Sequence, residues 1–301
     1  MNTIKPVGFQ EYWQATLRNL AKYPTAPEIR PLPLRSTPYA ECFSVKITSA
    51  GPYRLFAYLS IPKGEGNFPA IYYPPQYKSV LEIIPQGSSN YLRSRYVVMS
   101  LAGRGQRNSD QPYSAMFPGQ FTENIGDLDN YVFRNIVADG IRGLEFLFAR
   151  PEVDRKRIAV VGNDVALMTT ALLDGSPYVI CTPSLFVDSI SRSGKSNSYP
   201  MEEINDYLNL FPSKKNSVEE TLSYFDLRWF APMVTGKTLI MAGPRGTLLD
   251  AEALGDVASE FAGDYTIYES VNSSYKDGLY SENWLSEAFG FGNSILPAHW
   301  V

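Results

Sequence analysis

Residues 157–173, RIAVVGNDVALMTTALL, decide the fold class of this chain. Residues 157–162 are almost entirely apolar, which is typical of a strand at the centre of a parallel sheet. A tight turn at Gly162-Asn163-Asp164 follows, and residues 165–173 are predicted to form an apolar helix. Ligands of open α/β sheets bind at the carboxyl ends of the strands, so this turn is the first candidate for a site.

The rest of the chain alternates between strand-like and helix-like segments. Two stretches with alternating polarity, 42–48 and 53–61, predict an antiparallel start. Further strands are expected at 68–73, 95–101, 178–182, 237–242 and 265–269. Helices are expected at 9–21, 134–149, 201–210, 217–225 and 250–262. This order predicts an α/β fold, with a doubly wound, mostly parallel sheet and helices on both faces.

No stretch of the sequence divides the chain convincingly into separate domains. We expect a single domain over residues 1–301, with an N-terminal helix and extension at 1–40. A Pro-rich crossing segment, 24–38, is expected after that helix. Residues 187–233 are expected to form an inserted helical segment.

The composition narrows the classes of function. The chain has 301 residues, with 27 Lys and Arg against 31 Asp and Glu, which gives a net charge of −4. A hydrophobic share of 44% excludes wholesale disorder. The acidic balance disfavours nucleic acid as a partner, because phosphate binding needs a basic surface. The sequence has neither a secretory signal nor an apolar run of about 18 residues, so we expect no membrane partner.

The cysteine and histidine content restricts the chemistry further. Cys42 and Cys181 lie far apart and form no disulfide framework, which favours a cytoplasmic protein. The one histidine is His299, so mechanisms that need a histidine as a base or as a metal ligand are almost excluded. Asp127 and Asp129 form a D-x-D pair without a histidine cluster or a calcium-loop pattern. We therefore predict neither a metal nor a cofactor.

Several stretches together resemble a known family. They are Gly8-Phe9 to Trp13, Arg104-Gly105-Gln106, GQFTENIGDLDNYVFR at 119–134, RPEVD at 150–154 before Arg157-Ile158, and TLSYFD at 221–226. Over roughly residues 7 to 275 the chain resembles the acetyl xylan esterase / cephalosporin-C deacetylase family of α/β-hydrolases. The resemblance implies the α/β-hydrolase fold. Because the family commonly forms cyclic hexamers, it also implies a homo-oligomer.

The chain departs from that family at all three positions of the catalytic triad. The family has a serine nucleophile at the strand-to-helix elbow, where this chain has Asp164. Gly246 stands where the family has the aspartate that orients the catalytic histidine. Ser273, give or take one residue, stands where the family has that histidine. A serine hydrolase needs a nucleophile, a base and an orienting carboxylate, so we expect no ordinary esterase activity.

The resemblance implies that part of the family's oxyanion site is retained. Tyr77 resembles the residue whose backbone N–H helps to hold the oxyanion, and Val165 would supply the second N–H. Arg245 lies beside the lost triad aspartate and would suit a carboxylate or phosphate ligand. Asp164 either caps the helix that starts near Val165 or faces a ligand, and the sequence leaves both roles open.

Three functions remain open. The first is a pseudoenzyme that binds a small molecule or a protein partner. The second is a lyase, isomerase or cyclase that uses Asp164 as an acid or base, with the N–H groups of Tyr77 and Val165 as an oxyanion hole. The third is a hydrolase with Asp164 as the nucleophile, although that chemistry needs a histidine to activate water.

Overall fold

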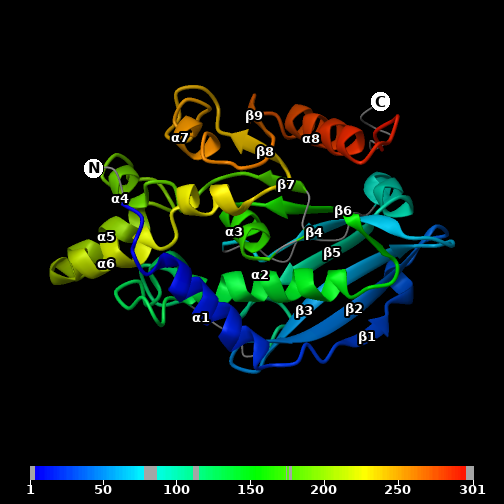
Figure 1. Cartoon of the computed structure of the whole chain (residues 1–301), viewed down its shortest axis with the longest axis horizontal. Helices are drawn as coiled ribbons and strands as arrows, with labels where there is room; N and C mark the ends of the chain where they lie inside the picture. Colours follow the sequence, from blue (N-terminus) through cyan, green and yellow to red (C-terminus); the bar gives the residue numbers. More distant parts are fainter. Residues whose placement is uncertain (1–3, 78–86, 111–114, 174, 176–177, 296–301) are drawn as a thin grey trace.

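A nine-stranded sheet, with helices on both faces, forms the centre of the molecule (Figure 1). The computed structural model describes residues 4–77, 87–110, 115–173, 175 and 178–295. The strands are β1 (Glu28–Pro31), β2 (Ala40–Ser49), β3 (Tyr53–Pro62), β4 (Phe68–Tyr73), β5 (Val97–Ala102), β6 (Val153–Gly162), β7 (Tyr178–Cys181), β8 (Lys237–Ala242) and β9 (Tyr265–Glu269). Their order across the sheet is β1-β2-β3-β5-β4-β6-β7-β8-β9. The pairs from β1 to β3, and β3 with β5, are antiparallel, whereas the pairs from β5 to β9 are parallel.

The helices separate into two groups by the face of the sheet that they cover. They are α1 (Phe9–Ala21), α2 (Val132–Phe148), α3 (Asp164–Leu172), α4 (Ser189–Ser193), α5 (Glu202–Leu210), α6 (Lys215–Ser223), α7 (Gly255–Ala258) and α8 (Ser274–Ala288). Successive side chains of a strand point to opposite faces, and the core follows this rule. Tyr72 and Val160 pack with α2, whereas their neighbours Ile71 and Ala159 pack with α8. The expected doubly wound α/β sheet is therefore confirmed.

The first helix of the chain also agrees with the sequence-based prediction. Helix α1 has the predicted bounds and buries Phe9, Trp13 and Leu20. The Trp13 ring packs edge-on against Phe225 and Phe230, which brings α1 next to the end of the 187–233 segment. That segment contains α4, α5 and α6, as Figure 1 shows.

Three elements differ from the sequence-based expectation. Strand β1 forms within the Pro-rich stretch, where no strand was predicted. It lies at the sheet edge, where Pro31 costs no ladder hydrogen bond. Helix α8 was not expected at all, because Gly278 interrupts its pattern and Leu285 is among its few buried side chains. The helix expected at 250–262 shortens to α7, preceded by turns.

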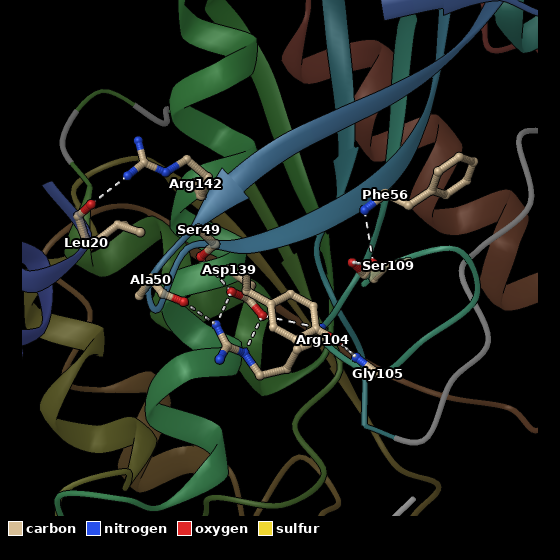
Figure 2. Close-up of polar contacts among 11 residues, drawn as sticks. Leu20, Ser49, Ala50, Phe56, Arg104, Gly105, Ser109, Asp139 and Arg142 are labelled. Carbon is tan, nitrogen blue, oxygen red and sulfur yellow. Dashed lines mark hydrogen bonds and ion pairs between the residues drawn. The ribbon is translucent and has the colours of Figure 1, made fainter. Parts of the chain in front are cut away.

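The loop after β5 is fixed to α2 by a buried ion pair (Figure 2). Asp139 is fully buried and accepts hydrogen bonds from Arg104 Nε and Nη2 at 2.9 and 2.7 Å. The hydroxyl of Ser49 donates to the same carboxylate at 2.6 Å. Gln106, in the same loop, donates from Nε2 to the backbone oxygen of Gln76 at 3.0 Å. These bonds hold the loop after β4, which borders the candidate site.

Candidate functional site

A cavity of about 520 Å³ lies where the parallel strands end. Strands β4, β6, β7 and β8 contribute their carboxyl-terminal residues, and α8 contributes one wall. Its apolar lining includes Val161, Ile180 and Met241. This is the position at which α/β sheets bind ligands, so the cavity is the candidate site.

The polar lining of the cavity offers mostly neutral groups. Two carboxamides, of Gln76 and Asn163, and four hydroxyls, of Tyr73, Thr182, Ser184 and Ser281, belong to it. In the part of the chain that the structure describes, the side chains of Gln76, Asn163 and Thr182 make no hydrogen bond. These groups are available to a ligand. A carboxylate, Asp277, completes the polar lining.

The elbow between β6 and α3 presents Asn163 to the cavity. Asn163 precedes the helix with φ −102° and ψ −149°, and neither it nor Asp164 has the positive φ seen at other turns of the chain. A nucleophile elbow is a strained turn that exposes its tip residue. Here the turn is relaxed, and Asp164 is already the first residue of α3.

Asp164 faces away from the cavity, into the loop that follows β7. Its side chain is fully buried, and both carboxylate oxygens are occupied. Oδ2 accepts from the backbone N–H of Ser184 at 3.0 Å and from the Ser184 hydroxyl at 2.5 Å. Oδ1 accepts from the N–H groups of Leu185 and Phe186 at 3.1 and 2.9 Å. The carboxylate thus orders a loop; it makes no capping bond to its own helix.

A buried arginine holds the same loop from the opposite side. Arg192 Nη2 donates to the backbone oxygens of Ser184 and Leu185 at 2.8 and 2.7 Å. Burial lowers the pKa of Arg192, while the negative charge of Asp164 acts in the opposite direction. The two charges compensate each other across the loop. Consequently Asp164 is part of a structural network that sets the position of Ser184 at the cavity.

Asp277, on α8, is the carboxylate that the cavity does expose. Its Oδ1 accepts from Tyr268 Oη at 3.0 Å and from the N–H of Val271 at 3.2 Å. Its Oδ2 accepts from the Ser270 hydroxyl at 2.6 Å. These donors fix the side chain at the end of β9, in the lining of the cavity to which Asn163 also belongs.

The side chain of Tyr77 is occupied elsewhere. Its ring stacks on Tyr199, and its hydroxyl donates to the buried carboxylate of Glu203. Burial and that hydrogen bond raise the pKa of Tyr77. Glu203 also accepts from the N–H of Phe121 at 2.9 Å, so it ties α5 to the 115–122 loop. The neighbouring residue Gln76, rather than Tyr77, lines the cavity.

The other predicted site residues lie in loops or in the core. Arg245 is exposed, and Gly246 donates its N–H to Asp250 at 2.8 Å within the loop after β8. Ser273 is the N-cap of α8, and its hydroxyl oxygen accepts from the N–H of Lys276 at 3.3 Å. Val165 is buried, and its N–H belongs to the first turn of α3, where no intrahelical acceptor exists.

None of the six predicted site residues is among the described residues that line the cavity. Tyr77 and Val165 were predicted to act through their backbone N–H groups, and the roles given to all six residues stay predictions. Gln76 and Asn163 directly precede Tyr77 and Asp164, so the family comparison came within one residue of both. Ser184 and Asp277 were missed, and only the expectation of α8 would have brought Asp277 to notice. His299 lies outside the described residues.

Metal and membrane signals are not found in the described part of the chain. Within it, no three side chains of His, Cys, Asp or Glu gather as metal ligands do. No described helix is both long and apolar enough to cross a membrane. Cys42 and Cys181 are buried free thiols.

An acetyl esterase is among the curated proteins to which the chain is similar. The chain is 25% identical over 257 residues to acetyl esterase Axe7A of Xylanibacter ruminicola; the match covers 80% of this chain and 57% of that protein. The chain therefore spans a little over half the length of this curated relative.

Two solved structures are similar over almost the whole chain. Acetyl xylan esterase 1 from a Thermoanaerobacterium species has a TM-score of 0.83 with 23% identity, covering 96% of both chains. An acetyl xylan esterase from a Paenibacillus species has a TM-score of 0.85 with 19% identity, covering 95% of this chain and 96% of the other. At these identities the likeness shows the α/β-hydrolase-like fold. The sequence profile of the acetyl xylan esterase family matches residues 2–250, and this chain therefore belongs to that family.

Proposed function

We propose that this chain is a non-hydrolytic member of its family, a pseudoenzyme whose cavity binds a small hydroxylated molecule. The observation that carries the proposal is the state of Asp164. Its side chain is fully buried, and four donors from Ser184, Leu185 and Phe186 occupy its oxygens. A group held in this way is not positioned to attack a ligand in the cavity or to move its protons.

The hydrogen bond of the Ser184 hydroxyl supports the same proposal. Ester hydrolysis of the family's kind needs a base that removes the proton of the nucleophile. The Ser184 hydroxyl donates to Asp164, which lies inside the structural network, and no described residue of the cavity lining is a histidine. The chain's one histidine, His299, lies outside the described residues.

The class of ligand follows from the free polar groups. A carboxamide offers both a donor and an acceptor, which matches the mixed character of a hydroxyl group. The carboxamides of Gln76 and Asn163 and the hydroxyl of Thr182 have no partner in the described structure, and apolar side chains line the same cavity. A sugar or another polyol fits this combination. The similar proteins reported above are named as acetyl esterases, two of them as acetyl xylan esterases.

The two catalytic alternatives are weaker on the same geometry. A lyase, isomerase or cyclase that used Asp164 as acid or base would need that carboxylate to contact its substrate. A hydrolase with Asp164 as the nucleophile would need the same contact. Both require the 184–186 loop to release Asp164, which would leave its backbone N–H groups without an acceptor.

The setting of the protein is also part of the proposal. We propose a cytoplasmic location, which the two buried free thiols support, because thiols persist in a reducing compartment.

We propose that the chain forms a homo-oligomer, because members of the family commonly assemble into rings. Light scattering of the purified chain tests this, and a monomer at every concentration would contradict it. We propose no nucleic-acid partner, in view of the net charge of −4.

The experiment that tests the central proposal combines hydrolysis with binding. The purified chain is incubated with a small acetate ester, and the ester's hydrolysis is compared with that of Ser184→Ala and Asp164→Ala variants. Binding of glucose and xylose is measured in parallel by ligand-observed NMR. We expect the chain to bind the sugars and to hydrolyse the ester no faster than the two variants do. Saturable turnover that either variant abolishes would contradict the proposal.

A further inference from the structure

Asp277 gives the ligand cavity a definite sign of charge. Its Oδ1 accepts two hydrogen bonds, from Tyr268 and Val271, whereas its Oδ2 accepts one, from Ser270. An ionised carboxylate has about four acceptor positions. Oδ2 therefore retains capacity for a donor that a ligand brings into the cavity.

The carboxylate of Asp277 is ionised at neutral pH. Burial raises its pKa, but the hydrogen bonds that the carboxylate accepts from Ser270, Val271 and Tyr268 outweigh that effect and hold the pKa below its usual value. Hydrogen bonds that a carboxylate accepts favour its charged form. The cavity thus presents a fixed negative charge.

No lysine, arginine or histidine is among the described residues that line the cavity. Arg245, which the sequence suggested for anion binding, is exposed and does not belong to the lining. The other polar groups, including Gln76 and Asn163, are neutral. Field lines from a single charge are concentrated in a cleft with apolar walls, so a cation is attracted and an anion repelled.

We infer that the cavity selects its ligand by charge, taking small hydroxylated amines as cations and rejecting carboxylates of the same size. The inference rests on the proposed function, because it takes the cavity to bind a hydroxylated small molecule. The ammonium group of the ligand donates to Oδ2 of Asp277. The carboxamides of Asn163 and Gln76 bind its hydroxyl groups.

Three sugars of similar size and different charge test the inference. D-glucosamine is the cation, D-glucose the neutral ligand and D-glucuronate the anion, each titrated against the full chain by ligand-observed NMR. We expect glucosamine to bind about tenfold more tightly than glucose, which is the effect of one charge-assisted hydrogen bond. We expect glucuronate to bind more weakly than glucose. Added salt should reduce the advantage of glucosamine and leave glucose unaffected.

Variants assign the preference to Asp277. Asp277→Asn keeps the shape and removes the charge, so the advantage of glucosamine over glucose should fall to about twofold or less. Asp256→Asn makes the same change on α7, at an exposed position outside the cavity lining, and should keep the tenfold advantage. Asn163→Asp adds a second carboxylate to the cavity and should raise the advantage. That variant provides an independent test if Asp277→Asn does not fold.

The outcomes separate this inference from the proposed function. Tight binding of glucuronate, or an unchanged glucosamine preference in Asp277→Asn, overturns charge selection and leaves ligand binding intact. Failure of all three sugars to bind overturns both proposals. Charge-selective binding together with saturable ester hydrolysis overturns the proposed function alone.

Discussion

Replacing Asp164 by Asn tests whether the side chain at the elbow is a structural acceptor. Asn keeps one acceptor oxygen, but its NH₂ group replaces the other. Each carboxylate oxygen accepts from at least two donors of the 184–186 loop. Whichever way the amide is turned, it therefore points a donor at backbone N–H groups. The variant also removes the negative charge that compensates the buried Arg192.

The expected cost follows from the number of donors that lose their acceptor. A buried donor without a partner costs about 1–3 kcal/mol. With one or two backbone N–H groups affected and a buried charge left unpaired, we expect Asp164→Asn to lower the free energy of unfolding by about 3 kcal/mol. Urea unfolding followed by far-UV circular dichroism measures this, with the slope of the transition unchanged.

The matched control is Asp256→Asn, on the exposed side of α7. It should change the free energy of unfolding by less than about 0.5 kcal/mol. An Asp164→Asn variant as stable as this control would show that the hydrogen bonds from Ser184, Leu185 and Phe186 contribute nothing to stability, contrary to this prediction. Asp164→Ser, which restores the residue type of the family's nucleophile, should be destabilised to a similar extent and should remain inactive toward acetate esters.

Three further changes test other parts of the structure. A Cβ at Gly119 would collide with the buried Glu203 carboxylate, so Gly119→Ala should cost about 1–3 kcal/mol in urea unfolding, whereas Gly255→Ala, with open space around it, should be neutral. Asp139→Asn breaks the buried ion pair of Figure 2 and should cost about 3–5 kcal/mol; a loss under about 1 kcal/mol would contradict that pairing. Because the folded-state pKa of Asp277 is lowered, its carboxylate stabilises the fold above the unfolded pKa and loses this effect as pH falls through the folded one. The Tm difference between wild type and Asp277→Asn should therefore be present at pH 7 and shrink below about pH 4; a constant difference would contradict this.

Much of the fold could be predicted because the apolar residues of its strands and helices are regularly spaced. The apolar strand β6 and the helix α3 that follows it are recognisable from residues 157–173 alone. Family resemblance added the α/β-hydrolase fold, which the comparisons confirm. Helix α8 was not predicted, because it covers its sheet face mainly with partly buried aromatic side chains such as Trp284 and Tyr280. Gly278 also interrupts the helical spacing of its apolar residues.

The candidate site was predictable only as far as its loops. Sequence position placed a residue at the elbow but did not determine the direction of its side chain. Asp164 turns toward the N–H groups of the 184–186 loop because a buried carboxylate needs donors, and those donors come from a segment twenty residues further along the chain. Such a long-range match leaves no local signal. The same holds for Asp277, whose partners are held by the end of β9.

The most direct test of the central claim is the steady-state hydrolysis of 4-nitrophenyl acetate by the purified wild-type chain. We expect a rate no greater than that of the Ser184→Ala variant, with no saturation as the ester concentration rises, because Asp164 is enclosed in the 184–186 network. Saturable turnover that is lost in Ser184→Ala or Asp164→Ala would contradict it, and would show that the cavity still carries out chemistry.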